Sequence, residues 1–317
     1  MFQIYMKRFG LIYTERICFQ TMDSKSIFSK FENLTVWKQG SKRAPHKPLL
    51  ALYALSCAIQ QDKRLLPFSE LNSKLVELLH DFGPPQKTYR PEYPFWRMQK
   101  DGIWEVKSPE PVEWQLTNSG DAKKTQLLHH NAHGGFPEKI YKLLKNDPSL
   151  FSNVVQKLLE DNFPPSIHED ILQAIGIDFS AGITTIKRRD PDFRNRVLRA
   201  YENRCAICGF DIRMDHTPIC LEAAHIKWHT AGGPDEEKNG LALCTLHHKL
   251  FDRGAFTFSE DMKILVSDRA NGSDAFNKWL LNYHGQRLTA PNRTIYQPSM
   301  AFRTWHVREV FKGEVRE

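Results

Sequence analysis

The sequence lacks any long, uninterrupted apolar run. A membrane helix needs roughly 18 or more such residues, and the longest apolar stretch, residues 49–59, is shorter and contains Ser56. The first 22 residues carry charges such as Arg8 and Glu15 among apolar side chains, so they lack the continuous core of a signal peptide. The sequence therefore predicts neither a membrane span nor a secreted protein, and residues 1–22 are interpreted as an N-terminal extension.

Cysteine is also scarce, with 6 residues in the chain. Cys18, Cys57 and Cys220 have no partner at CxxC spacing, and the other three fall in one short stretch. A secreted disulfide framework is not indicated by this pattern, and a reducing compartment fits it better. We therefore expect a cytoplasmic protein.

Length and charge set wider bounds. A chain of 317 residues is long enough for two domains, each with its own core. The 44 Lys and Arg against 37 Asp and Glu give a net charge of +7, which suits a polyanionic partner such as DNA. A moderately basic soluble protein without such a partner is equally compatible with these counts.

The chemistry is concentrated between Cys205 and Gly254. Two residues separate Cys205 from Cys208, and two residues separate Cys244 from His247. This spacing is typical of zinc ligands and predicts a tetrahedral Cys3His site. Zinc binding is worth on the order of 10 kcal/mol in zinc-finger peptides, so this structural zinc should hold the small region folded.

Three further polar residues are interleaved with these pairs. His225, Asn239 and His248 follow one another in the order H…N…H, and Asp252 lies one helical turn after His248. Residues 190–254 resemble the HNH endonucleases, which implies a β-hairpin and a helix around one divalent ion. A zinc-stapled DNA-binding or scaffold module without catalysis is the alternative, but it leaves these three residues unexplained.

For phosphodiester hydrolysis, the resemblance implies a role for each residue. His225 is expected to be the general base, because a neutral imidazole accepts a proton near pH 7. His248 and Asp252, four residues apart on a helix, should face the same way and hold one Mg²⁺ or Mn²⁺ ion. Asn239 is expected to fix the loop and orient His225.

The sequence departs from the family at one position. Ala224 precedes the predicted base, where the family usually has a metal ligand. Glu222 lies two residues earlier, on the same side of a strand as Ala224, and is expected either to substitute as a ligand or to leave the ion with more waters.

The N-terminal half is predicted to be a separate, mostly helical domain with short strands. Apolar residues at helical spacing follow Pro48, which predicts a buried helix. Other helix starts are predicted at Ser69, Pro137, Asp147-Pro148 and Ser166, where Ser166 and Glu169 form a capping box and Gly176 ends the helix. Aromatic-rich segments predict short strands at residues 93–96, 102–106 and 112–116, with Asp101-Gly102 as a hairpin turn.

Two segments of this half carry residues suited to binding. The loop containing Arg43, His46 and Lys47 precedes a predicted helix N-terminus, where backbone N–H groups would favour a phosphate. A solvated basic loop explains it equally well. Tyr93 and Pro94 begin an aromatic cluster beside a cation, and on its own such a cluster is more often core than site.

Together these two segments resemble the sulfur-binding domain of phosphorothioate-dependent restriction endonucleases, a family that joins this domain to a C-terminal HNH nuclease. The resemblance spans residues 24–175. Sulfur is a large, polarizable and poor hydrogen-bond acceptor, so a cup of apolar rings accepts it at less cost than an oxygen anion. The resemblance implies a cup lined by Tyr93 and Pro94, with DNA contacts from Arg43, His46 and Lys47.

One residue of the cup differs from the family. Arg97 occupies the position of a small residue in the family's cup. This substitution changes the third wall of the predicted sulfur site.

The second domain should begin with the basic run Lys187–Arg189 and a helix at Asp190-Pro191, after a linker at residues 179–186. Arginines on this helix could track phosphates or form a solvated face. Beyond the HNH stretch, the sequence predicts a hairpin of residues 256–258 and 264–266 and a short helix at residues 274–281. His284 and His306 are expected at the surface or at an edge.

The overall expectation is an α+β protein. Its predicted parts are an extension (1–22), a sulfur-binding-like DNA-binding domain (23–178), a linker (179–186) and an HNH nuclease domain of ββα-metal type with a structural zinc (187–317). The leading interpretation is an endonuclease that recognises double-stranded phosphorothioated DNA, with a homodimer as one way to cut both strands. An HNH endonuclease for methylated or unmodified DNA, or a non-catalytic zinc protein, is the alternative.

Overall fold

The computed structural model describes residues 24–36, 42–177 and 191–317. The contacts within the chain define two units. Unit 1 comprises Met1–Val36, His46–Val76 and Arg90–Leu158, and unit 2 comprises Trp37–Pro45, Glu77–Tyr89 and Leu159–Glu317. The predicted extension, the predicted linker and the basic run with Asp190 lie outside the described residues.

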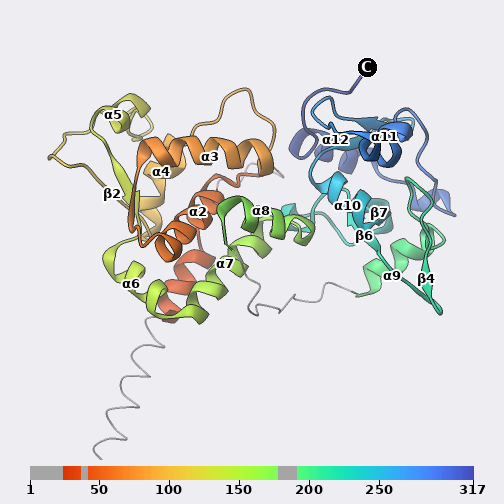
Figure 1. Ribbon diagram of the computed structural model, residues 1–317, viewed down its shortest axis with the longest axis horizontal. Helices are drawn as coiled ribbons and strands as arrows, with labels where there is room; N and C mark the ends of the chain where they lie inside the picture. The colour runs from red at the N-terminus through yellow and green to blue at the C-terminus, as the bar shows by residue number, and fades with distance from the viewer. Residues whose placement is uncertain (1–23, 37–41, 178–190) are drawn as a thin grey trace, which may run out of the picture. The chain divides into compact units, whose positions relative to one another are not determined.

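Unit 1 is mostly helical, as predicted (Figure 1). Residues 24–32 are helical, and the named helices are α2 (His46–Gln60), α3 (Phe68–Phe82), α4 (Glu92–Arg97), α5 (Lys124–His129), α6 (Glu138–Asn146) and α7 (Pro148–Asn162). Helices α3 and α7 end in segments that belong to unit 2. Three short strands, β1 (Leu65–Pro67), β2 (Glu105–Lys107) and β3 (His133–Gly135), form an antiparallel sheet in the order β1-β3-β2.

Helix α2 forms the centre of the unit 1 core. Every residue from Pro48 to Ala58 except Tyr53 is buried, so this helix is enclosed on all sides. The Tyr53 hydroxyl donates a hydrogen bond to Glu70 Oε1 on α3 (3.0 Å). The start of α2 near Pro48 confirms the predicted buried helix, because a proline in the first turn removes no helical hydrogen bond.

The strand predicted at residues 93–96 is wrong, because these residues form helix α4. Their aromatic side chains favour strands by intrinsic preference. Pro94 nevertheless lies in the first turn of α4, where its missing N–H is not needed. Phe95 is buried against Phe68 and Trp104, with ring centroids 4.8 and 6.0 Å away. Packing in the core decides the local structure here.

The predicted hairpin at Asp101-Gly102 is also wrong. A 3-10 helix, η1 (Met98–Asp101), ends at Gly102, and the following strand β2 pairs with β3. Residues 112–116 form no named strand and contribute one isolated bridge, Leu116 to Ala122. Strand partners far apart in sequence were not visible in the local pattern.

Unit 2 combines helices with two-stranded antiparallel sheets, so the α+β class is confirmed. Its helices are α8 (His168–Ile175), α9 (Pro191–Ala200), α10 (Thr245–Asp252), α11 (Asp274–Trp279) and α12 (Met300–Glu309), with the 3-10 turns η2 (Pro165–Ile167), η3 (His229–Ala231), η4 (Glu237–Asn239), η5 (Leu281–Tyr283) and η6 (Thr294–Tyr296). Its strands are β4 (Arg213–Met214), β5 (Thr217–Pro218), β6 (Leu221–His225), β7 (Gly240–Cys244), β8 (Phe256–Phe258) and β9 (Ile264–Val266). Helix α8 ends at Gly176 in the left-handed region (φ 78°), as predicted.

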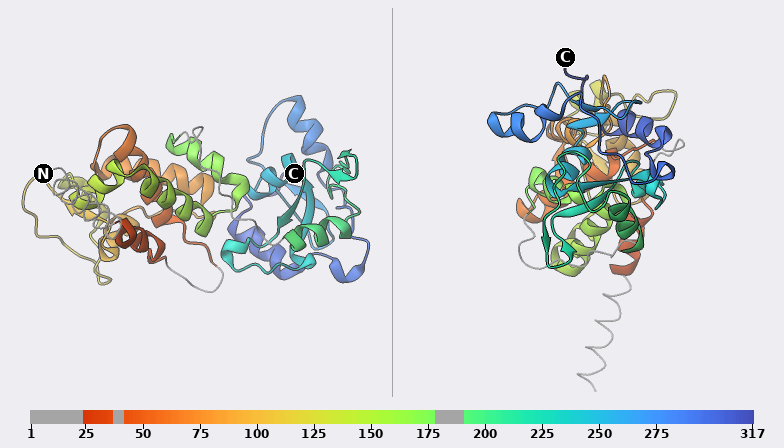
Figure 2. Two further views of the ribbon diagram at one scale, coloured as in Figure 1. Left: turned by 90° about the horizontal axis from the view of Figure 1, so that it is seen from below. Right: turned by 90° about the vertical axis from the view of Figure 1, so that its right-hand side faces the viewer.

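The centre of unit 2 is the hairpin of β6 and β7, which pairs Leu221 with Cys244 and His225 with Gly240. Helix α10 begins directly after β7, and helices α9 and α10 both pack on the two strands (Figure 2). This is the ββα arrangement expected for the HNH stretch. It places the end of β6, the start of β7 and one face of α10 close together.

The C-terminal part of unit 2 contains one confirmed element and one error. Strands β8 and β9 pair as predicted, with Phe256 opposite Val266. His306 is fully buried in α12, stacked on Phe251 at 3.8 Å between ring centroids, so its predicted surface position is wrong. Its Nε2 donates to the Phe251 carbonyl (3.1 Å), and its Nδ1 accepts from the Thr257 hydroxyl (3.1 Å). These two hydrogen bonds make the imidazole compatible with the core.

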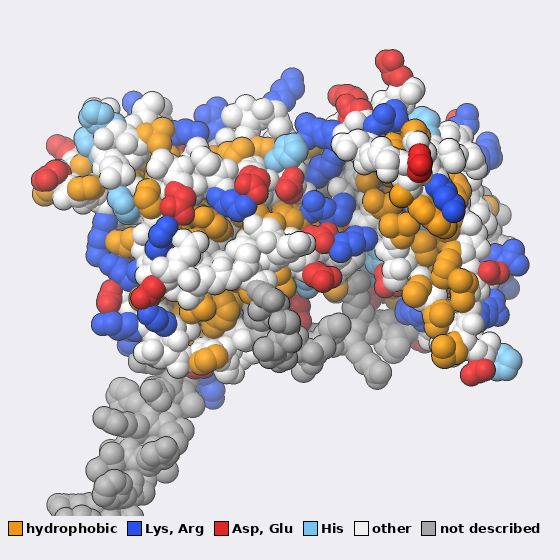
Figure 3. Space-filling model, in the orientation of Figure 1, with side chains coloured by type: hydrophobic (Ala, Val, Ile, Leu, Met, Phe, Trp, Pro, Cys, Tyr) orange, Lys and Arg blue, Asp and Glu red, His pale blue; other side chains and the backbone are white. Residues whose placement is uncertain are grey.

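Charged side chains of both signs are mixed over the face shown in Figure 3. Lys and Arg alternate there with Asp and Glu, together with patches of hydrophobic side chains.

Candidate functional site

The four predicted zinc ligands converge in unit 2. Cys205, Cys208, Cys244 and His247 each present one ligand atom, and all four atoms lie within 4.8 Å of one another. His247 Nδ1 faces Cys244 Sγ at 3.1 Å and Cys205 Sγ at 3.7 Å, while its Nε2 donates to the Trp279 carbonyl at 2.8 Å.

This donor set fits zinc. Three thiols and one imidazole are the ligands of a structural Cys3His site. Hydrogen bonds from Cys208 and Cys244 lower the pKa of the Cys205 thiol, which favours the thiolate that a metal binds. The bond from His247 to the Trp279 carbonyl fixes the tautomer with Nδ1 toward the thiols, as expected around a bound metal.

Asn239 ties together the loop between β6 and β7. It is completely buried, and its Oδ1 accepts from the Lys227 N–H at 2.8 Å. Its Nδ2 donates to the carbonyls of Lys227 (3.0 Å) and Pro234 (2.9 Å). A Cβ on Gly233 would lie 1.8 Å from the Lys227 carbonyl oxygen, so only glycine fits beside this amide. The side chain therefore holds the loop that follows His225 from within.

His225 lies at the end of β6 and is 5% exposed. Its Nε2 is 2.7 Å from Asp235 Oδ1, and its ring stacks on Phe193 at 4.1 Å between centroids. Asp235 is held in turn by Arg196, whose Nη2 donates to the Asp235 carbonyl at 2.8 Å. With Nε2 as the donor to Asp235, Nδ1 is the nitrogen that carries the lone pair.

Asp235 contacts the predicted base, although the sequence pattern does not predict a role for it. It lies in the turn after Gly232-Gly233-Pro234, ten residues from His225. An acidic residue after a Gly-Pro turn has no fixed spacing to the base, so the available signal was weak. Arg196 on α9, expected to face phosphates or solvent, contacts this turn instead.

His248 lies between two carboxylates. Its Nδ1 is 2.6 Å from Glu222 Oε2, and its Nε2 is 3.0 Å from Asp252 Oδ2. Burial lowers the pKa of His248, but the two carboxylates outweigh burial and raise this pKa to about 9. Asp252 is buried, which raises its pKa, but the charge of His248 and hydrogen bonds from His248 and Ser166 lower it overall. In the metal-free protein His248 is therefore an imidazolium at neutral pH.

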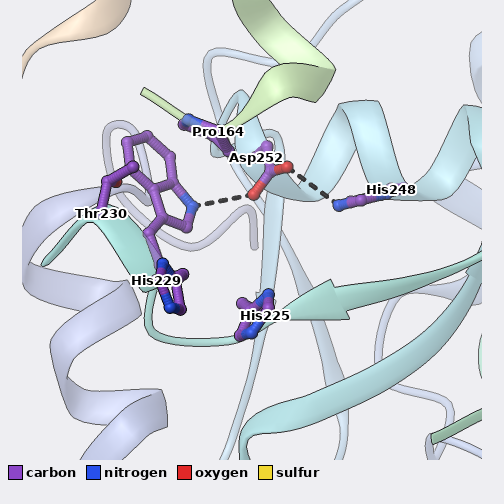
Figure 4. A pocket seen from close by; sticks show the side chains of 7 residues that line it. Pro164, His225, His229, Thr230, His248 and Asp252 are labelled. Carbon is purple, nitrogen blue, oxygen red and sulfur yellow. Dashed lines mark hydrogen bonds and ion pairs between the residues drawn. The ribbon is translucent and has the colours of Figure 1, made fainter. Parts of the chain in front are cut away.

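The Asp252 carboxylate is fixed on both oxygens. Trp228 Nε1 donates to Oδ1 at 2.8 Å (Figure 4). The Ser166 hydroxyl donates to Oδ2. Ser166 does not form the predicted capping box, because α8 begins after Ile167 and has no side-chain cap. Its hydroxyl is used at the functional site instead.

His225, His248 and Asp252 line one pocket. Its lining residues are Pro164, His225, Trp228, His229, Thr230, His248 and Asp252 (Figure 4). The predicted base and the predicted ligands His248 and Asp252 therefore share a cavity. Glu222 is not part of this lining.

The three predicted ligands of the catalytic ion do not converge on one point. Glu222 and Asp252 lie at opposite nitrogens of the His248 ring, so an ion on one nitrogen has only one of these carboxylates beside it. Within the described ranges, the Cys3His cluster is the one group of three or more His, Cys, Asp or Glu side chains whose ligand atoms converge. His248 Nε2 with Asp252 fits a hard divalent ion that takes its remaining ligands from water and a phosphate. Glu222 would then orient the ring through Nδ1.

The predicted DNA contacts are divided between the two units. Arg43 belongs to unit 2, where its guanidinium donates to the carbonyls of Glu309 (2.8 Å) and Phe82 (2.6 Å) and lies 3.9 Å over the Trp228 ring. These contacts commit the Arg43 side chain to the interior of unit 2. They also place it next to Trp228, the donor to Asp252.

The other four predicted DNA contacts lie in unit 1. Lys47 is paired with buried Asp101 at 2.5 Å. Burial lowers the pKa of His46 to about 4, so this imidazole is neutral at pH 7. Tyr93 is 37% exposed, whereas Pro94 is buried. Tyr93 is therefore the most accessible of the predicted cup residues.

Arg97 forms a fixed wall beside Tyr93. Its Nε and Nη2 donate to the two oxygens of Asp121 at 2.7 and 2.6 Å, and Asp121 is buried. The guanidinium lies 4.8 Å from the centre of the Tyr93 ring. A two-point pair of this kind fixes the orientation of the guanidinium. Arg97 is the residue that the sequence aligns with the third wall of the predicted cup, and its guanidinium lies beside the Tyr93 ring.

Two family models match the chain. Residues 24–180 match the ScoMcrA-like DNA sulfur-binding domain, and residues 205–259 match the HNH endonuclease family. The chain joins a DNA sulfur-binding domain to an HNH endonuclease domain. Both resemblances stated from the sequence are thereby confirmed, and the protein is an HNH-type DNA endonuclease.

Solved structures of similar proteins were also found. The sulfur-binding domain of ScoMcrA complexed with phosphorothioated DNA is 22% identical, with a TM-score of 0.41, and the match covers 47% of this chain and 94% of that one. The sulfur-binding domain of SprMcrA complexed with phosphorothioated DNA is 19% identical, with a TM-score of 0.41. This match covers 49% of this chain and 94% of that one. The type IV phosphorothioation-dependent restriction endonuclease ScoMcrA is 23% identical, with a TM-score of 0.40. This match covers 55% of this chain and 38% of that one. The match thus spans little more than a third of that enzyme.

The comparison with curated proteins gave no match. Among the helices that the structure describes, none is long and apolar enough to cross a membrane.

Proposed function

We propose that this protein is a modification-dependent restriction endonuclease that binds double-stranded phosphorothioated DNA through its sulfur-binding domain and cuts it at a one-metal HNH site. The observation that carries the proposal is the pocket in which His225, His248 and Asp252 meet, in a chain that also matches the sulfur-binding family. A cytoplasmic location follows from this role. The predicted division into residues 23–178 and 187–317 assigns one task to each domain.

His225 acts as the general base of the hydrolysis. Asp235 holds Nε2–H, so Nδ1 accepts the proton of the attacking water. The water oxygen then bonds to phosphorus, and the bond from phosphorus to the 3′ oxygen breaks. Asn239 keeps the loop behind His225 in place, so the base is oriented before DNA arrives.

His248 Nε2 and Asp252 would hold the divalent ion, Mg²⁺ or Mn²⁺, with Glu222 steadying His248 from the other nitrogen. When bound, the ion supplies positive charge for the developing phosphorane and the departing oxygen. Ala224 leaves the family's usual additional ligand position without a donor. We therefore expect water to occupy more of the coordination shell than in enzymes with an acidic residue there.

In unit 1 the exposed ring of Tyr93 is the proposed contact for sulfur, with buried Pro94 supporting it. His46 and Lys47 lie at the start of α2 and would contact DNA through its backbone or bases. Arg43 is the weakest of the proposed DNA contacts, because its guanidinium is already bonded within unit 2.

A second candidate function keeps the nuclease and changes the target of the first domain to methylated or unmodified DNA. Arg97 favours it, because a fixed guanidinium beside Tyr93 can bind an ordinary phosphate oxygen as well as a sulfur-bearing one.

The test uses two matched plasmids, one phosphorothioated and one not, incubated with the full chain and Mn²⁺ or Mg²⁺. We expect cutting of the modified plasmid alone, and no cutting by His225→Ala, which should still bind the modified DNA. Cutting of both plasmids would reassign the first domain. Cutting of neither plasmid, despite binding, would contradict the proposed one-metal hydrolysis at His225. Light scattering of the complex tests whether two copies assemble to cut both strands.

A further inference from the structure

The Asp252 carboxylate receives hydrogen bonds from two residues that are far from it in sequence. Trp228 comes from the segment after β6, and Ser166 comes from η2, 86 residues before Asp252. Asp252 is 3% exposed, so its oxygens depend on protein donors for solvation. Oδ2 is shared between the Ser166 hydroxyl and His248 Nε2. Ser166 therefore touches the same oxygen that faces the predicted ion ligand His248.

The segment that carries Ser166 is also anchored to α10 and to the C-cap residue of that helix. Asp170 on α8 is 2.7 Å from Lys249 Nζ and 3.8 Å from Arg253 Nε. His168 Nε2 donates to the Phe163 carbonyl at 2.9 Å, which closes the turn on itself. Two positions of α10, residues 249 and 252, and the C-cap residue Arg253 are thus held by one short segment. The position of the Ser166 hydroxyl is fixed by this anchoring.

The same turn forms part of the pocket wall. Pro164 lines the pocket together with His225, His248 and Asp252 (Figure 4). Ile167 is buried and α8 has no side-chain cap, so capping does not account for the Ser166 hydroxyl. Its observed partner is Asp252.

We infer that Ser166 is a positioning residue of the nuclease site, which sets the Asp252 carboxylate beside His248 Nε2 for a divalent ion. Ser166 lies outside the residues that match the HNH family and inside those that match the sulfur-binding family, although its contacts place it in unit 2. The HNH match therefore does not contain a complete site. The inference rests on the proposed one-metal chemistry.

Binding of Mn²⁺ to the zinc-loaded full chain, followed by electron paramagnetic resonance of the free ion, tests this without DNA. Ser166→Ala should bind Mn²⁺ about 10- to 100-fold more weakly, the range typical when a residue that orients a metal ligand is removed. Ser166→Thr keeps the hydroxyl and should bind Mn²⁺ nearly as tightly as the unaltered protein does. Ser273→Ala, an exposed serine of unit 2, is the matched control and should bind as the unaltered protein does.

Zinc content and the unfolding midpoint show whether each variant is folded. If Ser166→Ala does not fold, Ser166→Cys replaces it, because a thiol is nearly the same size and a weak donor. Unchanged Mn²⁺ affinity in the folded variant, or no Mn²⁺ binding by the unaltered chain, overturns the inference. If Ser166→Ala loses Mn²⁺ affinity but the unaltered chain cuts neither plasmid, the role of Ser166 is supported and the proposed function fails. With active protein, Ser166→Ala should lower kcat and leave KM for DNA unchanged.

Discussion

Asp235 Oδ1 lies 2.7 Å from Nε2 of His225, although His225 ends β6 and Asp235 lies ten residues later, just before η4. The carboxylate selects the tautomer of His225, the proposed base, and the stacked Phe193 ring sets the plane of the imidazole. A general base needs the correct tautomer and the correct ring plane, because proton transfer requires the lone pair to face the attacking water.

Replacing Asp235 by Asn should therefore impair catalysis and spare binding. We expect kcat to fall about 10- to 100-fold, with KM for DNA unchanged. The imidazole ¹⁵N shifts of His225 should report a change from the Nε2–H tautomer. Glu236→Gln, at the adjacent exposed residue, is the control. An unaltered kcat in Asp235→Asn would remove Asp235 from the site.

The sequence predicted the parts of this site whose spacing is local. The zinc pairs and the series His225, Asn239 and His248 lie within 44 residues of chain, and β6, β7 and α10 bring them together as expected. Asp235 and Ser166 escaped prediction because their roles depend on distant partners. A serine three residues before a glutamate fits a capping box, and nothing local reveals that its hydroxyl reaches Asp252.

Core packing accounts for most of the other differences. Residues 93–96 have strand-forming side chains, yet Phe95 gains more by packing against Phe68 and Trp104 from a helix. His306 looked like a polar residue near the end of the chain, and it is buried because Thr257 and Phe251 satisfy both ring nitrogens. Such pairings are set by tertiary structure.

Removal of one zinc ligand should affect metal content and stability together. Cys205→Ser breaks the converging group of three thiols and one imidazole. We expect less bound zinc by atomic absorption and an unfolding midpoint lower by about 10 °C, since a loss of several kcal/mol has this effect in a unit of this size. Cys220→Ser, at an exposed cysteine outside the cluster, should change neither value. Full zinc occupancy in Cys205→Ser would contradict the assignment.

Tyr93→Ala should reduce the preference for phosphorothioated over ordinary DNA. The ring is the exposed apolar contact of the proposed cup, and we expect the affinity ratio to fall about tenfold, equivalent to ~1.4 kcal/mol. Tyr93→Phe keeps the ring and should keep the preference. Fluorescence anisotropy with matched duplexes measures both. A persistent preference in Tyr93→Ala would exclude this tyrosine from sulfur recognition.

Arg97→Ala distinguishes the two proposed targets. Without the guanidinium, binding to both duplexes should weaken, and ordinary DNA should lose more because its oxygens accept hydrogen bonds better than sulfur does. The affinity ratio in favour of sulfur should therefore rise. An equal loss for both duplexes would show that Arg97 acts only through its pair with Asp121.

Two histidines should make the stability of unit 2 depend on pH in separate windows. Burial lowers the pKa of His306 to about 4, below its unfolded value near 6.5. Between these values the unfolded chain binds the extra proton, so stability is full above pH 6.5 and falls as the pH drops toward 4, by up to ~3 kcal/mol. His248 behaves in the opposite sense in the metal-free protein. Its pKa of about 9 adds stability below pH 6.5, and this stability is lost as the pH rises to 9.

Urea unfolding of the full chain between pH 4 and 9 measures both losses of stability. The fall toward pH 4 is the acid limb of the stability curve, and the fall toward pH 9 is the alkaline limb. His306→Gln can keep one acceptor and one donor in the core but cannot take up the proton, so its acid limb should flatten while its alkaline limb remains. Divalent ion bound at His248 displaces the proton, so added Mn²⁺ should flatten the alkaline limb and leave the acid limb unchanged. An acid limb that is identical in His306→Gln and the unaltered protein would assign the acid sensitivity to other groups.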